Sequence, residues 1–189
     1  MNLPEVLKFT GLFSAPRAAI RRVSEFCLHY VTCMALVRIL VDGYSLLHNW
    51  PELAPGKPRF SAAAREELIH QLTLYRDAIG TPITIVFDGA NAEPRKAAVE
   101  STPELEILYS RVGQTADDII ERVTHRMRPF GEVLAVTDDF AERDTVIAMG
   151  GMASSCLNFI QTVESTLAEL KDDIKSYNRS ERNRFKRPK

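Results

Sequence analysis

The sequence predicts an α/β domain built on a central parallel sheet of about five strands, with helices on both faces. Short apolar runs alternate with helical patterns along most of the chain. These runs are continuous, which is typical of parallel strands that are buried on both faces. Three of them end in aspartate, at the position where open parallel sheets place their ligands.

The first expected strand covers residues 37–41 and ends at Asp42. A proline-containing loop, residues 49–60, should follow it. Ser61 is then a favourable N-cap for a helix that reaches about residue 79, because apolar residues recur there at helical spacing. Gly80 supplies the stop signal for that helix.

The middle of the chain continues the alternation of strands and helices. Ile83–Phe87 should form the second strand, and Leu105–Tyr109 a short third one. The polar stretch between them, residues 90–103, is expected to be an exposed loop beside the site. Thr115 is the expected N-cap of the next helix, which should end at Pro129.

The last part predicts two more strands and two more helices. Residues 133–137 should form the fourth strand, and residues 152–155 a fifth strand at the sheet edge. Between them, Asp139 with Glu142 three residues later is typical of a capping box at the start of a short helix. The apolar positions of residues 159–170 indicate the final helix.

Charge is distributed unevenly along the chain. Residues 37–177 contain 22 acidic and 14 basic residues, whereas residues 178–189 contain one acidic and six basic residues. We expect residues 178–189 to form a disordered basic tail. An acidic body with a basic arm is compatible with nucleic-acid binding through that arm.

The remaining sequence features bear on location and domain limits. Three cysteines, without a metal-binding pair, indicate reduced thiols in a cytoplasmic protein. No apolar run reaches the roughly 18 residues of a membrane helix. Residues 1–33 are interpreted as an N-terminal extension, with a transit peptide and a true start at Met34 as alternatives. The domain itself should cover residues 34–177.

Four carboxylates are the candidate catalytic and metal-binding groups. Asp42, Asp88 and Asp138 follow strands, and Asp117 lies in the first turn of a helix. Each alone has a structural explanation as a turn or cap residue. Together they should converge on one edge of the sheet, where like charges favour a bound cation. Oxygen ligands suit Mg²⁺ or Mn²⁺, which would support phosphodiester hydrolysis.

Several neighbours are expected to support these carboxylates. Thr115 and Asp118 fit a capping box, from which Asp118 can assist the site. Asp139 is interpreted as a cap rather than a ligand, and the Ser45 hydroxyl can hydrogen-bond a nearby carboxylate. Tyr44 and Trp50 could either stack on an unpaired base or anchor their loop in the core.

Five short motifs resemble, in order and spacing, those of the YacP-like NYN domain family of the PIN-like nuclease group. They are Asp42-Gly43-Tyr44-Ser45, Val86-Phe87-Asp88, Tyr109-Ser110, Thr115-Ala116-Asp117-Asp118 and Val136-Thr137-Asp138. The resemblance covers roughly residues 37–164. It implies a Rossmann-like PIN/NYN domain and a metal-dependent endoribonuclease in which Asp42, Asp88, Asp117 and Asp138 form the catalytic set.

The resemblance also implies RNA, in particular messenger RNA, as substrate and the ribosome as partner. The basic residues expected to contact RNA are Arg111, Arg179, Arg182, Arg184, Lys186 and Arg187. The family's first motif usually ends in Asn, where this chain has Ser45. That difference leaves open the alternative of a domain of the same fold that binds RNA or ribosomes without cutting, although the presence of all four acids argues against it. A receiver-type signalling domain is disfavoured because residues 152–156 contain no lysine.

Overall fold

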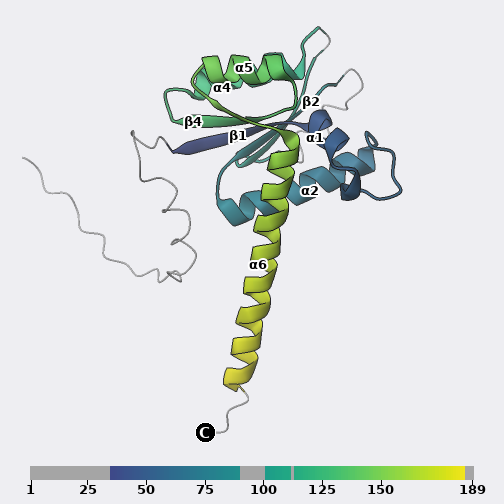
Figure 1. The fold of residues 1–189 in the computed structure, drawn as a ribbon, viewed down its shortest axis with the longest axis vertical. Helices are drawn as coiled ribbons and strands as arrows, with labels where there is room; N and C mark the ends of the chain where they lie inside the picture. Colours follow the sequence, from purple (N-terminus) through teal and green to yellow (C-terminus); the bar gives the residue numbers. More distant parts are fainter. Residues whose placement is uncertain (1–34, 90–100, 112, 186–189) are drawn as a thin grey trace, which may run out of the picture. The chain divides into compact units, whose positions relative to one another are not determined.

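The computed structural model describes residues 35–89, 101–111 and 113–185 (Figure 1). The chain from Met34 onward forms one compact unit. The expectations for the extension 1–33, for loop residues 90–100 and for Lys186 and Arg187 concern residues outside these ranges.

A five-stranded sheet with the order β3-β2-β1-β4-β5 forms the centre of this unit. Its strands are β1 (Leu36–Asp42), β2 (Ile83–Phe87), β3 (Leu105–Tyr109), β4 (Glu132–Val136) and β5 (Met152–Ser154). All neighbouring strands pair in parallel. The predicted parallel sheet of about five strands is therefore confirmed. The continuous apolar runs have the expected cause, since Leu40 and Val41 in β1 are fully buried although they face opposite sides.

The strand order creates a switch point beside the central strand. From β1 the chain moves outward through β2 to β3, and then crosses to β4 and β5 on the other side of β1. Successive connections on opposite sides leave a crevice at the carboxyl ends of β1 and β4. Asp42 ends β1, and the sequence Thr137-Asp138-Asp139 directly follows β4, so the acidic residues lie beside this crevice.

Helices cover both faces of the sheet, as predicted. They are α1 (Gly43–Asn49), the 3-10 helix η1 (Pro51–Leu53), α2 (Ala62–Ile79), α4 (Ala116–Met127), α5 (Phe140–Ala148) and α6 (Cys156–Phe185). Helices α1, α2 and the first half of α6 pack on one face, and α4 and α5 pack on the other (Figure 1).

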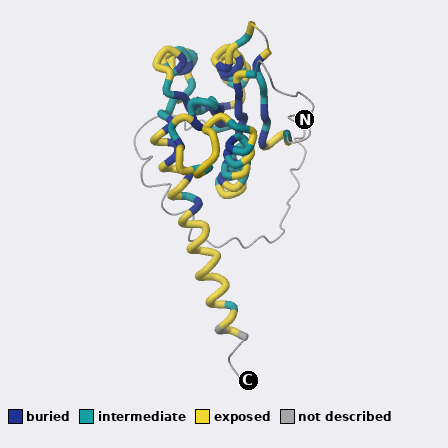
Figure 2. The backbone as a smooth tube through the Cα atoms, turned by 90° about the vertical axis from the view of Figure 1, so that its right-hand side faces the viewer, coloured by how far each residue is buried: buried dark blue, intermediate teal, exposed yellow. Residues whose placement is uncertain are grey.

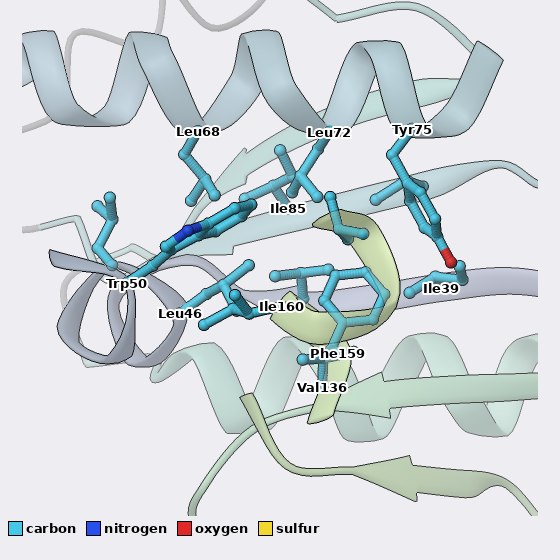
Figure 3. Packing of buried hydrophobic residues seen from close by; sticks show 14 of the residues in the cluster. Ile39, Leu46, Trp50, Leu68, Leu72, Tyr75, Ile85, Val136, Phe159 and Ile160 are labelled. Atoms are coloured by element: carbon cyan, nitrogen blue, oxygen red, sulfur yellow. The ribbon is translucent and has the colours of Figure 1, made fainter. Parts of the chain in front are cut away.

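The larger part of the core lies between the sheet and the α1, α2 and α6 layer (Figure 3). Leu68 and Leu72 point from α2 toward the strands, and Trp50 lies beside them. Tyr75 of α2 meets Phe159 of α6 edge-to-face, with ring centroids 5.6 Å apart. Each fully buried large apolar side chain contributes about 1.5–3 kcal/mol, so this layer fixes α6 against the sheet.

The N-terminal half follows the sequence prediction except at one element. Ser61 caps α2 by accepting a hydrogen bond from the Ala64 N–H at 3.2 Å. Gly80 ends the helix in the left-handed conformation with φ +72°. Helix α1, however, lies between the expected first strand and the expected loop 49–60, where no helix was predicted. It has seven residues and begins with glycine, so it carries no helical periodicity that could have revealed it.

Helix α6 corrects the prediction of a disordered tail, because it continues to Phe185 and makes residues 178–185 helical. Its apolar stripe also continues past the sheet, where Leu170, Ile174 and Tyr177 become 39%, 51% and 67% exposed. The second half of the helix is consequently almost entirely exposed (Figure 2). Two i,i+3 ion pairs support it. Among the described residues, no helix is both long and apolar enough to cross a membrane.

Gly43 is required by the close packing of α1 against β2. A Cβ atom at this position would lie 2.3 Å from the Phe87 ring. That ring is fully buried between Tyr44 and Tyr109, so it has little room to move. The glycine after Asp42 thus brings the start of α1 close to the end of β2.

We expect Gly43→Ala to lower the free energy of unfolding by about 1–3 kcal/mol, the usual cost of overpacking a core. Urea unfolding followed by the fluorescence of Trp50, the single tryptophan of the chain, measures this change. In a double-mutant cycle with Phe87→Leu, the cost of Gly43→Ala should shrink, because the smaller side chain leaves space. An equal cost in both backgrounds would show that ring contact is not the reason for glycine.

Candidate active site

Asp42 is both the last residue of β1 and the N-cap of α1. Its Oδ1 accepts hydrogen bonds from the backbone N–H groups of Tyr44 at 3.0 Å and Ser45 at 3.2 Å. Ser45 thus contacts Asp42 through its backbone. These bonds hold the carboxylate at the carboxyl end of the central strand, which makes the capping and site interpretations of Asp42 compatible.

Asp88 joins three elements at the same edge. Its Oδ1 accepts hydrogen bonds from the Ser110 hydroxyl at 3.0 Å and from the Ala116 N–H at 2.8 Å. Ser110 Oγ in turn accepts a bond from the Gly89 N–H at 3.0 Å. Asp88 therefore ties the ends of β2 and β3 to the N-terminus of α4, where a negative charge is favourable.

Asp117 lies at the same edge, in the first turn of α4. The predicted capping box beside it is confirmed: Thr115 Oγ1 accepts from the Asp118 N–H at 3.2 Å, and Asp118 Oδ2 accepts from the Thr115 N–H at 3.0 Å. Partial burial raises the pKa of Asp117, and the charges of Asp139, Asp42, Asp88 and Asp118 raise it further. Two of the other predicted carboxylates, Asp42 and Asp88, therefore lie close enough for their charges to act on Asp117.

The two aspartates after β4 have different surroundings. Asp138 Oδ1 accepts a hydrogen bond from the Cys156 N–H at 2.9 Å, so it binds the start of α6. Asp139 caps α5, accepting from the Ala141 N–H at 2.8 Å. Among the charges that raise the pKa of Asp117, that of Asp139 has the largest effect. Both aspartates thus cap helices, and Asp139 is also electrostatically coupled to Asp117.

Glu142 is a fifth acidic group that sequence reasoning assigned to a capping box. The reciprocal half of that box is absent, because neither carboxylate oxygen of Glu142 has a hydrogen-bond partner among the described residues. The side chain is instead turned inward and is only 6% exposed. A glutamate at the third position of a helix suits either arrangement, so the sequence offered no signal for burial.

Burial raises the pKa of Glu142 to about 7, with smaller contributions from the charges of Asp117, Asp42 and Asp139. The Thr137 hydroxyl lies close enough to oppose this shift but does not reach hydrogen-bonding geometry. Glu142 and Asp117 line a cavity of about 150 Å³ between α4 and α5. We call Asp42, Asp88, Asp117, Asp139 and Glu142 the acidic cluster, of which Asp117 and Glu142 line this cavity.

The donor set of the acidic cluster fits a hard divalent cation. All of its side-chain donors are carboxylate oxygens, which suit Mg²⁺ or Mn²⁺. The buried, unpartnered oxygens of Glu142 are donors without another function in the described part of the chain. Within residues 35–89, 101–111 and 113–185, no three acidic, histidine or cysteine side chains are close enough to enclose an ion. Binding would therefore draw the side chains together.

The expected RNA-contacting residues fall into two groups. Arg111 is exposed on the loop after β3, next to Ser110 at the acidic edge. Arg179, Arg182 and Arg184 are exposed on the second half of α6. At about 1.5 Å per residue, Arg179 lies about 35 Å along the helix from its start beside Asp138. The two groups are therefore far apart.

Of the aromatic candidates, Trp50 and Tyr44 anchor the core. Trp50 is 6% exposed and donates its indole N–H to Glu164 Oε1 at 3.1 Å, while Tyr44 packs edge-on against Phe87. The sequence analysis overlooked Phe140, which begins α5 next to Asp139 and is 76% exposed. The Arg143 guanidinium lies 5.5 Å from the centre of its ring.

The sequence profile of the YacP-like NYN domain matches residues 39–188, and the chain belongs to this family. The resemblance seen in the sequence motifs is thereby confirmed, and the match extends into the second half of α6.

Comparisons with Bacillus subtilis proteins support this assignment. The protein YacP of strain 168 is 25% identical over 128 residues, which cover 67% of this chain and 75% of YacP. The crystal structure of Rae1 (YacP) superposes with a TM-score of 0.66 at 21% identity, covering 79% of this chain and 85% of that one. A crystal structure of Rae1 with one tryptophan replaced by leucine superposes with a TM-score of 0.64 at 22% identity, covering 76% and 84%.

We expect Glu142→Gln to stabilise the metal-free protein, and to do so more at about pH 8 than at about pH 5. In the unfolded chain the carboxyl has a pKa of 4.5, and in the folded protein its pKa is about 7. The folded state therefore loses stability as pH rises through this window, and above it bears the full cost of the buried charge. Gln removes that cost, which we expect to be about 1–2 kcal/mol after solvent screening.

Urea unfolding in the presence of a chelator measures this difference, with the exposed Asp144→Asn on the same helix as control. A stabilisation that is the same at both pH values would contradict the buried charge.

Proposed function

We propose that this protein is a metal-dependent endoribonuclease that hydrolyses RNA phosphodiesters at the acidic edge of its sheet. The observation that carries the proposal is the position of three carboxylates at the carboxyl edge of the sheet: Asp42 ends β1, Asp88 follows β2 and accepts a hydrogen bond from the start of α4, and Asp117 lies in the first turn of α4. Membership of a family with a PIN-like nuclease fold supports a ribonuclease type of activity. A protein that only binds RNA gains nothing from negative charge where phosphates must approach.

Mg²⁺ or Mn²⁺ is the cofactor that this cluster suits. Asp42, Asp88 and Asp117 would hold the ion, together with a carboxylate from the β4 side, for which Asp138 is the sequence candidate. When bound, the ion neutralises charge on the phosphate and makes a water molecule more acidic. The bound ion would also reduce the electrostatic repulsion among the carboxylates.

The chain's own hydrogen bonds prepare the site for this chemistry. Backbone N–H groups of α1 orient Asp42, and the Ser110 hydroxyl and Ala116 N–H orient Asp88. Each set of bonds ends on Oδ1, so it fixes the plane of the carboxylate through one oxygen. Asp118 assists indirectly, because its capping box with Thr115 fixes the first turn of α4 and with it Asp117.

RNA would reach the site past Arg111 and leave along α6. Stacked nucleotides advance by about 3.4 Å each, so a strand touching both the acidic edge and Arg179 needs about ten nucleotides. Phe140, exposed beside Asp139, is placed to stack on an unpaired base. We propose messenger RNA on the ribosome as the substrate, since the projecting basic helix offers a contact to ribosomal RNA while the edge meets the cleaved strand.

Asp42→Asn and Asp117→Asn should each reduce cleavage of a mixed RNA substrate with Mg²⁺ or Mn²⁺. Because these carboxylates would hold the ion, the loss should exceed the roughly 10–100-fold typical of residues that only orient metal ligands. Asp144→Asn is the control, circular dichroism checks the fold, and each reaction is run with and without ribosomes. If the wild type binds RNA or ribosomes but cuts under no divalent ion, the alternative of a binding module replaces the nuclease.

Changing Arg179, Arg182 and Arg184 to Gln together should weaken binding of long RNA and lower its salt dependence. Loss of three phosphate contacts reduces the log–log slope by about 2 for a single strand. Cleavage of oligonucleotides shorter than about ten nucleotides should stay unchanged, because they cannot reach these residues. A double change of the exposed Arg122 and Arg126 on α4 to Gln is the control. An equal effect of both variants would argue against a specific path along α6.

A further inference from the structure

We propose that Glu142 completes the cation site, and that Asp138 is a positioning residue for α6 rather than a ligand. The inference rests on the proposed function, because it concerns the ion that the acidic cluster would hold. It differs from the sequence-based assignment, in which Asp138 was the fourth ligand and Glu142 only capped a helix.

Glu142 is buried without a hydrogen-bond partner among the described residues. The side chain is 6% exposed, and both of its oxygens lack hydrogen-bond partners among the described residues. A buried carboxylate is costly unless it is paired or coordinates a metal. The usual partner of a glutamate at this position of a helix is the N–H of the capping residue, but the Asp139 N–H donates to Thr137 Oγ1 at 3.1 Å.

Glu142 also faces a cavity. It lines a cavity of about 150 Å³ between α4 and α5 together with Asp117. The volume leaves room for a cation and several waters, each of which occupies about 30 Å³ in the liquid. Asp42 and Asp139 act on both Asp117 and Glu142. Glu142 therefore faces the same negative cluster as the proposed ligands, from its buried side.

Asp138, in contrast, has a structural role at the start of α6. Its Oδ1 accepts the Cys156 N–H at 2.9 Å and so supports the first turn of α6. Its charge also acts on the thiol of Cys156, the first residue of α6. A carboxylate engaged at a helix N-terminus is stabilised without an ion.

The test measures Mn²⁺ binding directly, by calorimetric titration of the metal-free full chain. Wild type, Glu142→Gln, Asp138→Asn and the control Asp144→Asn are compared. Glu142→Gln should weaken the Kd for Mn²⁺ by at least about tenfold, whereas Asp138→Asn and the control should stay within about twofold of wild type.

Thermal unfolding separates a ligand from a structural residue. Without metal, Glu142→Gln should raise the Tm, since it removes a buried charge, and the further rise in Tm produced by Mn²⁺ should shrink. Asp138→Asn should lower the Tm without metal and keep the Mn²⁺-induced rise. A lower Tm for Glu142→Gln with an undiminished Mn²⁺-induced rise would assign Glu142 a structural role and overturn the inference.

The outcomes also distinguish this inference from the proposed function. Tight Mn²⁺ binding by wild type and Glu142→Gln alike would overturn the role of Glu142 and leave the nuclease proposal intact. Weak binding by Glu142→Gln in a protein that cleaves no RNA would support the ion site while refuting the nuclease. Absence of Mn²⁺ binding by the wild type would refute both.

Discussion

Hydrogen bonds from helix N-termini to aspartates organise the carboxyl edge of this sheet. Asp42 accepts from α1, Asp88 from α4, Asp139 from α5 and Asp138 from α6. A parallel sheet with helical connections places strand ends and helix starts at the same edge, so this arrangement follows from the topology. Backbone N–H groups thereby stabilise negative charge that would otherwise repel. In this protein, the same hydrogen bonds cap the helices and hold the aspartates at the acidic edge.

The charges of two acidic groups in the cluster, Asp117 and Glu142, are not compensated by such hydrogen bonds among the described residues. Burial and the charges of neighbouring carboxylates raise the pKa of Asp117, and burial without a partner raises that of Glu142. They border one cavity between α4 and α5. Asp117 and Glu142 are thus the carboxylates that a cation in this cavity would stabilise most. This localisation connects the packing of two helices to the proposed chemistry.

The two halves of helix α6 have different roles. Its first half belongs to the core, through Phe159 and its neighbours, and its start is fixed by Asp138 at the acidic edge. Its second half carries exposed arginines about 35 Å away, by the rise of the helix. Because one rigid element joins both, RNA held on the far half would have a fixed geometry relative to the edge. The proposed substrate is accordingly a long strand.

The sequence by itself determined the strands, because strands buried on both faces require continuous apolar runs. It also determined the helix caps at Ser61 and Thr115, because capping is a local interaction. It also placed the strand-end aspartates at one edge, since parallel strands share a direction. Tertiary structure decided the rest. Helix α1 forms where Gly43 lets it pack on Phe87. Helix α6 continues to Phe185, beyond Tyr177, the last residue of its apolar stripe in the sequence. Whether Glu142 caps its helix or turns inward depends on the packing of α5 against α4, which is set by contacts distant in the sequence.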